Sequence, residues 1–347
     1  MAGSIAGSLM QGGAGPSATP IPLQILVVAG GGGGGFWAPT DQCVTGSGGG
    51  GGFISTTGTV QTGITYNVQV GAGGTTNCSS TSNGQDSCFS TLVTSTGGGR
   101  GGRGAGNLCA ASPGGSGGSK GFAPQPGLNT NWGCGIAGQG HPAGCGSCPF
   151  TPCNGPAAGG GAGSCGTQGC QGPFQINQGC GGAGATGFNG ISYAGGGGPG
   201  GIVFLNGNGL QPGVGGASGG SGAGEGSCMK FIYLNPGHRS CPIFRYRVAG
   251  TAGGTNTGGG GGGSFTWGQI ANLPPTPAAI GVFFCGIPGI AGTGVNARAG
   301  GSGGSGVVII AYPTSFPVAN ATTGSPIATT IGISRYYCFT GSGSITW

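Results

Sequence analysis

The residues able to do acid–base chemistry are few and widely separated in this chain. The sequence holds three acidic residues and two histidines, namely Asp41, Asp86, Glu225, His141 and His238. They lie in separate glycine-rich stretches, without the spacing of a nucleophile elbow or of an HExxH zinc motif. We therefore expect a protein that is not an enzyme and that uses no cofactor.

A metal site is the second chemistry that the residues suggest. The stretch CGSCPFTPC at residues 145–153 contains a C-x-x-C pair, and His141 precedes it closely. A zinc ribbon needs a second pair at matching spacing, and the later cysteines do not supply one cleanly. We therefore expect disulfides rather than a metal ion in this segment.

Cysteine usage points to an oxidising destination, because the chain has 15 cysteines. Cys78 and Cys88 bracket one turn-rich loop, and Cys228 and Cys241 bracket another, so we expect each pair to close its loop. Each bond would stabilise the folded state by ~2–4 kcal/mol, because it restricts the unfolded chain. The odd count leaves one thiol free or paired with a neighbouring subunit.

Composition excludes several protein classes. The chain has 97 glycines in 347 residues but no Gly-X-Y period, which excludes collagen. Only 3% of its residues are charged, against roughly 25% in an ordinary domain. Disordered chains combine many charges with few apolar residues, whereas this chain is 35% hydrophobic. We therefore expect packing and association with other copies, and the net charge of +6 weakly favours an anionic partner.

The recurring unit of the chain is a predicted strand followed directly by a run of glycines. Residues 23–35 read LQILVVAGGGGGG, a short apolar run followed by six glycines. Residues 64–70 alternate apolar and polar side chains, the pattern of a half-buried strand. We expect further strands at residues 89–96, 202–205 and 282–285.

Glycine runs are commonly flexible linkers, but an ordered run must satisfy its backbone amides through close neighbours. With so little charge and core in the chain, we expect residues 30–35 to be packed. Polyproline-II-type helices have no internal hydrogen bonds, and only glycine lets their backbones approach closely. The competing fold is a β sandwich with glycine loops. Our expected fold class is mostly β and irregular, with short β strands feeding ordered polyglycine (polyproline-II-like) runs, disulfide-stapled loops and almost no α-helix.

The sequence suggests three regions. Residues 1–22 form a small-residue docking arm, and residues 23–313 a glycine-rich domain with cysteine-rich insertions at about 104–190 and 228–248. Residues 314–347 form a Pro/Thr-rich linker and a terminal strand. We expect no secretory signal and no membrane span, although a leader removed before residue 1 would also fit.

The C-terminal stretch RYYCFTGSGSITW alternates like an edge strand. If residues 336–347 lie beside residues 25–29, they complete either their own sheet or the sheet of the next copy. The candidate assembly residues are Tyr336, Tyr337, Phe339, Ile345 and Trp347.

Residues 230–247 are the most charged and aromatic stretch, and function concentrates on loops held by rigid scaffolds. The candidate receptor-facing residues are Lys230, Tyr233, His238, Arg239, Arg245, Tyr246 and Arg247. The alternative is a solvated hairpin without a receptor. Residues 97–107 contain two arginines, too few for an RNA-binding tail, so we expect no nucleic-acid partner. Asn77 and Asn320 begin glycosylation acceptor patterns, which are common by chance.

The recurring motifs carry a resemblance. LVVAGGGGGG, ITYNVQVGAGG, ISYAGGGGPGG, TNTGGGGGG and GGSGGSGVVIIAYP look like the glycine-rich domain of phage tail-fibre and adhesin proteins, large-virus virion proteins and some bacterial surface proteins. The resemblance implies bundled polyglycine II helices whose connecting loops contact a host receptor. The cysteine-rich insertions depart from that pattern, and so does FTGSGSITW, which in the family usually lies upstream of the first strand.

Two functions follow as expectations. The first is a structural protein of a virion or extracellular surface, a rigid scaffold that displays a receptor-binding loop and contacts an anionic host envelope or glycan. The second is a subunit of a filament or coat lattice, assembled by donation of the terminal strand and without a receptor. For both functions we expect other structural proteins or further copies of the chain as partners.

Overall fold

The structure is a computed structural model. It describes residues 19–36, 45–77, 80–102, 110–121, 132–144, 157–171, 176–177, 179–200, 202–206, 209–211, 222–225, 228–233, 242–248, 250–264, 266–267 and 299–347. These residues form β strands and irregular segments and contain no helix. Accordingly, no helix among them is long and apolar enough to cross a membrane.

The first sheet joins the two ends of the described chain. Its order is β17-β18-β15-β1-β2, and each neighbouring pair is antiparallel. The strands are β17 (Ile327–Ile331), β18 (Ser334–Phe339), β15 (Val307–Pro313), β1 (Pro20–Val28) and β2 (Phe53–Gln61). Strand β1 pairs with β15 from Gln24 opposite Ala311 to Val28 opposite Val307. The centre of this sheet is therefore built from strands that are far apart in sequence.

The second sheet is also antiparallel, in the order β16-β19-β3-β4-β5. Its strands are β16 (Ala321–Thr323), β19 (Gly343–Thr346), β3 (Thr65–Gln69), β4 (Ser87–Phe89) and β5 (Val93–Ser95). The expected alternation of residues 64–70 is confirmed within β3, because Val68 is buried while its neighbours Asn67 and Gln69 are exposed. Ile64 precedes the strand and is 45% exposed, so the alternation does not extend to it.

The remaining strands form short hairpins and one three-stranded sheet. They are β6 (Cys170–Gln171), β7 (Ile176–Asn177), β8 (Ala185–Thr186), β9 (Ser192–Tyr193), β10 (Ile202–Asn206), β11 (Gly209–Gln211), β12 (Cys228–Tyr233), β13 (Pro242–Val248) and β14 (Thr266–Trp267). Their pairs are β6–β7, β8–β9, β12–β13, β10–β11 and the parallel pair β10–β14. The strand expected at 202–205 is thereby confirmed, and that expected at 282–285 lies outside the described residues.

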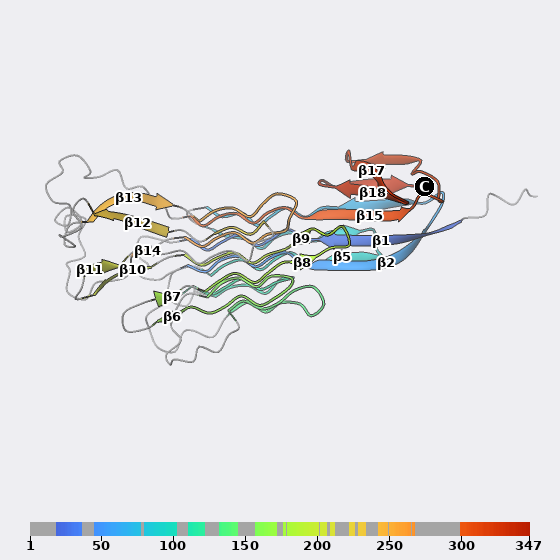
Figure 1. Ribbon diagram of the computed structural model, residues 1–347. Helices are drawn as coiled ribbons and strands as arrows, with labels where there is room; N and C mark the ends of the chain where they lie inside the picture. The colour runs from blue at the N-terminus through green and yellow to red at the C-terminus, as the bar shows by residue number, and fades with distance from the viewer. Residues whose placement is uncertain are drawn as a thin grey trace, which may run out of the picture.

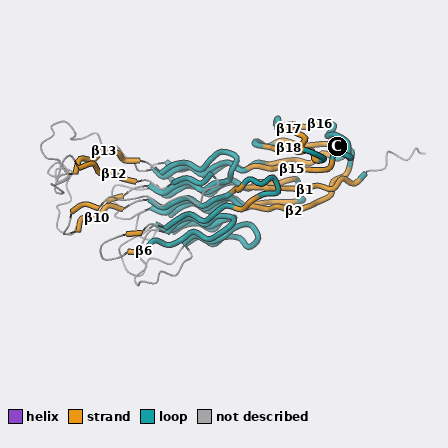
Figure 2. The backbone as a smooth tube through the Cα atoms, viewed as in Figure 1, coloured by secondary structure: helices purple, strands orange, loops and turns teal. Residues whose placement is uncertain are grey.

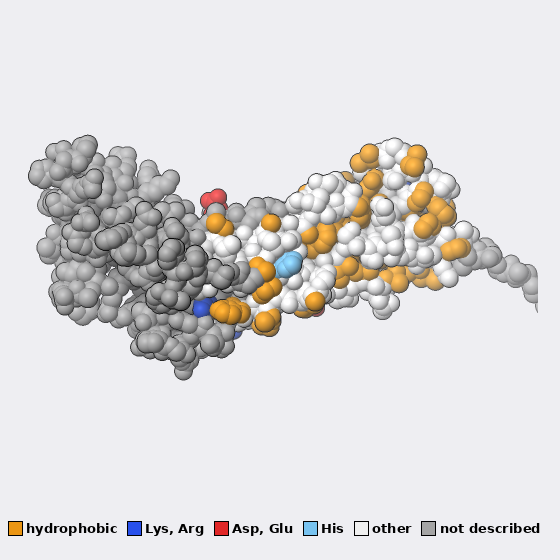
Figure 3. Space-filling view, turned by 60° about the horizontal axis from the view of Figure 1, so that its bottom comes forward, with side chains coloured by type: hydrophobic (Ala, Val, Ile, Leu, Met, Phe, Trp, Pro, Cys, Tyr) orange, Lys and Arg blue, Asp and Glu red, His pale blue; other side chains and the backbone are white. Residues whose placement is uncertain are grey.

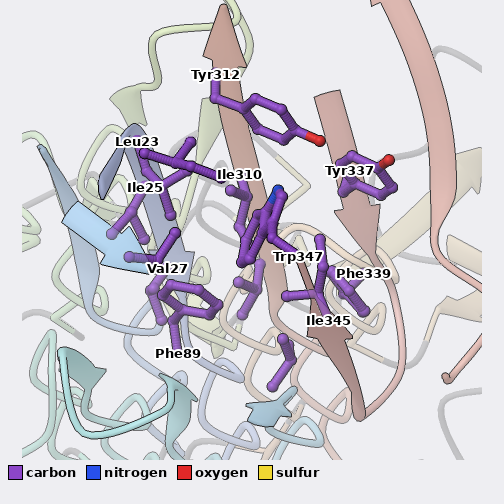
Figure 4. Packing of buried hydrophobic residues seen from close by; sticks show 14 residues of the cluster. Leu23, Ile25, Val27, Phe89, Ile310, Tyr312, Tyr337, Phe339, Ile345 and Trp347 are labelled. Atoms are coloured by element: carbon purple, nitrogen blue, oxygen red, sulfur yellow. The ribbon is translucent and has the colours of Figure 1, made fainter. Parts of the chain in front are cut away.

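The two five-stranded sheets pack face to face as a β sandwich (Figure 4). The sandwich core takes side chains from both sheets, which Figure 4 shows pointing toward one another. The larger members are Leu23, Ile25, Val27, Phe89, Ile310, Tyr312, Tyr337, Phe339, Ile345 and Trp347. Burying each large apolar side chain contributes roughly 1.5–3 kcal/mol, so this end is held by ordinary side-chain packing.

A smaller cluster lies on the opposite face of the first sheet. Leu26, Val28, Val307 and Ile309 pack there with Tyr193 from the β8–β9 hairpin. This cover explains why β1 alternates exposed and buried residues at its start but is buried on both faces from Ile25 onward.

Glycine-rich segments continue from the sandwich strands and fill the middle of the elongated molecule (Figures 1 and 2). We call them the glycine bundle: residues 29–36, 45–52, 70–77, 80–86, 96–102, 112–120, 157–164, 194–200, 250–264 and 299–306. Among its junctions, β1 leads into 29–36 and 299–306 lead into β15. The surface of the bundle shows few charged side chains (Figure 3). The predicted mostly β fold without helix is confirmed for the described residues, and glycine-rich segments continue from its strands.

Two predicted strands differ from the structure. The single strand expected at residues 89–96 is a hairpin of β4 and β5, because Ser90 adopts a positive φ of 49° and reverses the chain. The C-terminal edge strand is two strands, β18 and β19, and both lie inside their sheets rather than at an edge. In addition, β1 begins at Pro20 within the predicted arm, and β16 and β17 occupy the predicted linker.

Candidate functional site: the glycine bundle and the distal hairpin

The central run, residues 30–35, donates hydrogen bonds to three neighbouring runs in strict rotation. Its amides pair in turn with residues 80–86, 299–306 and 45–52, and the cycle then repeats. The bonds are Gly30 N to Gln85 O (3.0 Å), Gly31 N to Gly304 O (2.9 Å), Gly32 N to Gly49 O (2.9 Å), Gly33 N to Ser82 O (3.0 Å), Gly34 N to Gly301 O (2.8 Å) and Gly35 N to Gly46 O (2.8 Å). The pattern therefore repeats every three residues, whereas a β strand alternates with period two.

The carbonyl groups of the same run accept from three other neighbours. These hydrogen bonds are Gly98 N to Gly30 O (2.8 Å), Gly74 N to Gly31 O (2.8 Å), Gly261 N to Gly32 O (2.9 Å) and Gly101 N to Gly33 O (2.8 Å). These donors belong to residues 96–102, 70–77 and 257–264. The central run thus lies among six neighbouring runs, all six of its glycines are buried, and its backbone is paired without a single strand ladder.

No side chain fits into the central run. A Cβ on Gly30, Gly31 or Gly32 would overlap the carbonyl oxygen of Ala72, Gly259 or Gly99 respectively. The same three runs block Gly33, Gly34 and Gly35 in the same order. The expectation that residues 30–35 are packed is confirmed, because glycine is required here for the close approach of backbones.

Hydroxyl groups inside the bundle are part of its hydrogen bonding, which sequence reasoning missed. Ser47 Oγ donates to Gly197 O (2.7 Å) and accepts from Gly159 N (2.9 Å), so it joins two runs. Thr45 Oγ1 accepts from Ser264 N (2.7 Å). Ser47, Thr45 and Ser264 are fully buried. The available signal was the presence of single Ser and Thr residues beside long glycine runs.

The distal hairpin, β12 and β13, lies at the end of the molecule opposite the C-terminus (Figure 1). Its register shifts between Lys230 and Phe231, which leaves Arg245 as an extra residue between Phe244 and Tyr246. Of the candidate receptor-facing residues, the structure places Lys230 and Tyr233 on β12 and Arg245, Tyr246 and Arg247 on β13. His238 and Arg239 lie outside the described residues. The two strands pair as a hairpin, which tests neither the receptor-facing role nor its solvated alternative.

The candidate assembly residues are placed in the sandwich of their own chain. Tyr336, Tyr337 and Phe339 are on β18, which pairs with β15 and β17, and Ile345 is on β19, which pairs with β3 and β16. The sequence left open whether this stretch lies beside residues 25–29; in the structure it does not, because β1 has β15 and β2 as its two neighbours. Both sides of β1 are occupied by strands whose apolar residues complete the same core.

An aromatic cluster anchors the C-terminus. The Trp347 ring lies 5.7 Å from that of Tyr312 and 5.9 Å from that of Tyr66, both in edge-on geometry, and Tyr312 stacks on Tyr337 at 6.0 Å. The Tyr312 hydroxyl and the Trp347 indole nitrogen are buried without a hydrogen-bond partner. Burial raises the pKa of Tyr312 to about 12.

The predicted disulfide between Cys78 and Cys88 is wrong, because Cys88 is a free thiol. Cys88 lies in β4, whose pairing with β3 and β5 already holds this segment. Cys134, Cys180 and Cys338 are also free thiols, more than the one leftover that an odd count required, whereas Cys165 is disulfide-bonded. Cys228 is on β12, and its predicted partner Cys241 lies outside the described residues. Burial raises the pKa of the Cys338 thiol.

The acidic residues and the histidine that the structure describes do not form a cluster, and the acidic residues hydrogen-bond to residues of the bundle. Asp86 Oδ1 accepts from Gly97 N (2.8 Å), and the backbone nitrogen of Glu225 donates to Thr251 Oγ1 (2.7 Å). Among the residues that the structure describes, no three His, Cys, Asp or Glu side chains gather as a metal site would require. Asp41, His238 and residues 145–153 lie outside the described part of the chain.

Comparison with known proteins agrees with the geometry of the bundle. No curated protein and no solved structure matches the chain. The glycine-rich domain family matches residues 15–313, which include the central run and most of its neighbours. Residues 314–347 fall outside that match, yet they supply β16 to β19 of the sandwich. On the extent of this match, the chain belongs to the glycine-rich domain family.

Proposed function

We propose that this protein is a non-enzymatic structural protein of a virion or cell surface, in which a rigid glycine scaffold holds a receptor-facing hairpin. The observation that supports the proposal is the central run, whose six amides are all hydrogen-bonded to neighbouring runs and whose glycines are all buried. A segment bonded in this way acts as a strut rather than a linker.

The runs fit polyglycine II helices. Such helices have three residues per turn and no internal hydrogen bonds, and their amides point outward in three directions. The partner cycle of the central run has that period. Each bond contributes a net of about 0.5–1.5 kcal/mol, as other protein hydrogen bonds do, and an unpaired buried amide would cost roughly 1–3 kcal/mol. The many bonds therefore favour one fixed arrangement of the runs.

The scaffold separates the hairpin from the sandwich. The sandwich and the C-terminus lie at one end of the molecule and the β12–β13 hairpin at the other (Figure 1). Lys230, Arg245 and Arg247 give this hairpin basic residues in a chain with only three acids. An anionic envelope component or acidic glycan is the partner whose chemistry suits such a segment.

The filament alternative, in which the terminal strand is donated to the next copy, has less support. Strands β18 and β19 pair with strands of their own chain, and Phe339, Ile345 and Trp347 fill its core. We therefore favour display over donation.

Retention of the full chain on heparin beads, a polyanionic glycan, tests the display proposal. Arg245→Gln should elute at lower salt than the parent, because one cation of the hairpin is lost. Arg100→Gln removes the same charge from the exposed side of the bundle and is the matched control. Equal elution of Arg245→Gln and Arg100→Gln would overturn the assignment of the hairpin.

Hydrogen exchange of the backbone amides tests the rigid scaffold separately. Fast amide exchange at residues 30–35 would overturn it.

A further inference from the structure

Strand β17 is an unprotected edge of the first sheet. It pairs with β18, and all five of its residues, IATTI, are exposed. Ile327 is 63% exposed, Ile331 is 64% exposed and Ile333, in the following turn, is 80% exposed. A sheet edge with large apolar side chains offers both unpaired backbone groups and apolar surface to another strand.

Natural edges are usually protected by charge, proline, a bulge or shortness. Strand β17 has no charge and no proline, and its register with β18 is uninterrupted. The edges of the second sheet, β16 and β5, have only three residues each. The other edge of the first sheet, β2, exposes Ser55, Thr56 and Thr57 rather than isoleucines.

The sequence of β17 is complementary to itself in antiparallel orientation. Around a two-fold axis at Thr329, Ile327 of one copy lies opposite Ile331 of the other, Ala328 lies opposite Thr330, and Thr329 meets its own equivalent. Isoleucine pairs and threonine pairs of this kind each stabilise a ladder by roughly 0.2–1 kcal/mol.

The backbone groups of β17 agree with this register. The hairpin turn at Gly332, with a φ of 58°, connects Ile331 to its partner Ser334 across two residues. Such a turn is closed by a hydrogen-bonded pair, so the alternate residues Ala328 and Thr330 point their amides and carbonyls away from β18. Ala328 and Thr330 are the pair that meets in the two-fold register, so the outward groups of both copies would bond to one another.

The side chains of β17 would extend an existing apolar face. Ile327 pairs with Cys338 and Thr329 with Tyr336, so the isoleucines share the face of Tyr336, whose ring lies 6.4 Å from that of Phe188. This is the face opposite the sandwich core.

We propose that a second copy of this chain docks on β17, and that the two β17 strands pair antiparallel about Thr329 to form one ten-stranded sheet. This inference rests on the proposed scaffold function and names its partner. Strand β17 runs along the long axis (Figure 1), so the two glycine bundles would point in opposite directions and carry their hairpins at the two ends of the dimer.

Cysteine cross-linking of the full chain tests the register. Thr329→Cys places two thiols at the non-hydrogen-bonded position on the two-fold axis, where the Cα separation of about 4.5 Å suits a disulfide. Under mild oxidation it should give a dimer whose peptide map contains a disulfide between the substituted positions of the two copies. Thr57→Cys, on the opposite edge of the same sheet, is the matched control: it should still pair through β17 but give no disulfide between its substituted positions. Equal cross-linking of the two variants would overturn the proposal.

Sedimentation tests the interface without cross-linking. The parent should sediment as a concentration-dependent dimer, and Ile327→Lys with Ile331→Lys should sediment as a monomer. Both isoleucines are exposed, so the double variant should keep the parent's protection of amides 30–35. A monomeric parent would overturn the dimer while leaving the scaffold intact. Fast exchange of amides 30–35 in the parent would instead overturn the rigid scaffold, whether the parent is a monomer or a dimer.

Discussion

The sandwich and the glycine bundle solve the same problem of backbone pairing in different ways. In the sandwich, each strand pairs with one or two neighbours in a sheet, and side chains such as Ile310 and Phe339 fill the space between sheets. In the bundle, the central run bonds to neighbours on all sides, and its own positions leave no space for a side chain. Adding a methyl group should therefore destabilise the bundle, whereas removing one should destabilise the sandwich.

The largest effect is expected from adding a methyl group to the bundle. Gly32→Ala would place a Cβ on the carbonyl oxygen of Gly99, and moving the run that holds Gly99 would break its bonds from Gly98 N to Gly30 O and from Gly101 N to Gly33 O. We expect a loss of about 3 kcal/mol or more, because backbone cannot give way as a flexible side chain does. Amide exchange should show opening of residues 29–52 while β15 and β18 stay protected.

The matched control is Gly341→Ala in the loop before β19. An added Cβ there has no heavy atom within 4 Å, and no positive φ is required. Its melting temperature should equal that of the parent. If Gly32→Ala is tolerated as well as Gly341→Ala, the close packing of the central run is contradicted.

The second prediction removes methyl groups from the sandwich. Val308 is fully buried in the core, whereas Val318 is 56% exposed. Val308→Ala should lower the free energy of unfolding by about 2 kcal/mol through lost burial and a cavity, and Val318→Ala by little. Chemical denaturation of both variants measures the difference. Similar losses in the two would show that the sandwich does not depend on side-chain packing.

At neutral pH the smallest effect is expected from Tyr312 in the sandwich, whose contribution to stability changes only in alkaline solution. Burial raises the pKa of Tyr312 from 10.0 to about 12, so between these values the folded state keeps a proton that the unfolded state releases. The contribution is complete below pH 10 and is lost as the pH rises toward 12. Tyr312→Phe should flatten this dependence and change the stability at neutral pH only slightly, because the buried hydroxyl makes no hydrogen bond of normal geometry. Thermal melts of parent and variant across this range measure it, and an unchanged slope in Tyr312→Phe would contradict it.

Local sequence patterns predicted much of what each segment does. The alternation at residues 64–70 predicted β3, and the run of glycines after residues 25–28 predicted a packed element. For the aromatic and basic stretch at 230–247, a hairpin was one of the two alternatives that the sequence left open, and β12 and β13 pair as one. In each case the signal lies in residues close together in the chain, whose side chains, or lack of them, set the local backbone.

Long-range placement was not predictable in the same way. Residues 336–347 carry strand patterns that suit several positions in a sheet. A place beside β1 was one possibility, but β1 pairs with β15 and β2. Cys88 lies ten residues from Cys78, yet strand pairing rather than a disulfide fixes it. Spacing alone does not say which of several compatible neighbours a strand or thiol meets.

The sequence by itself determined that this chain is built from strands leading into glycine runs, because only glycine permits backbones to approach so closely. The tertiary structure alone decided which runs become neighbours of residues 30–35 and which strands close the sandwich. Glycine has no side chain with which to distinguish one partner from another, so that choice falls to the core residues of the sandwich, which join strands from the two ends of the chain.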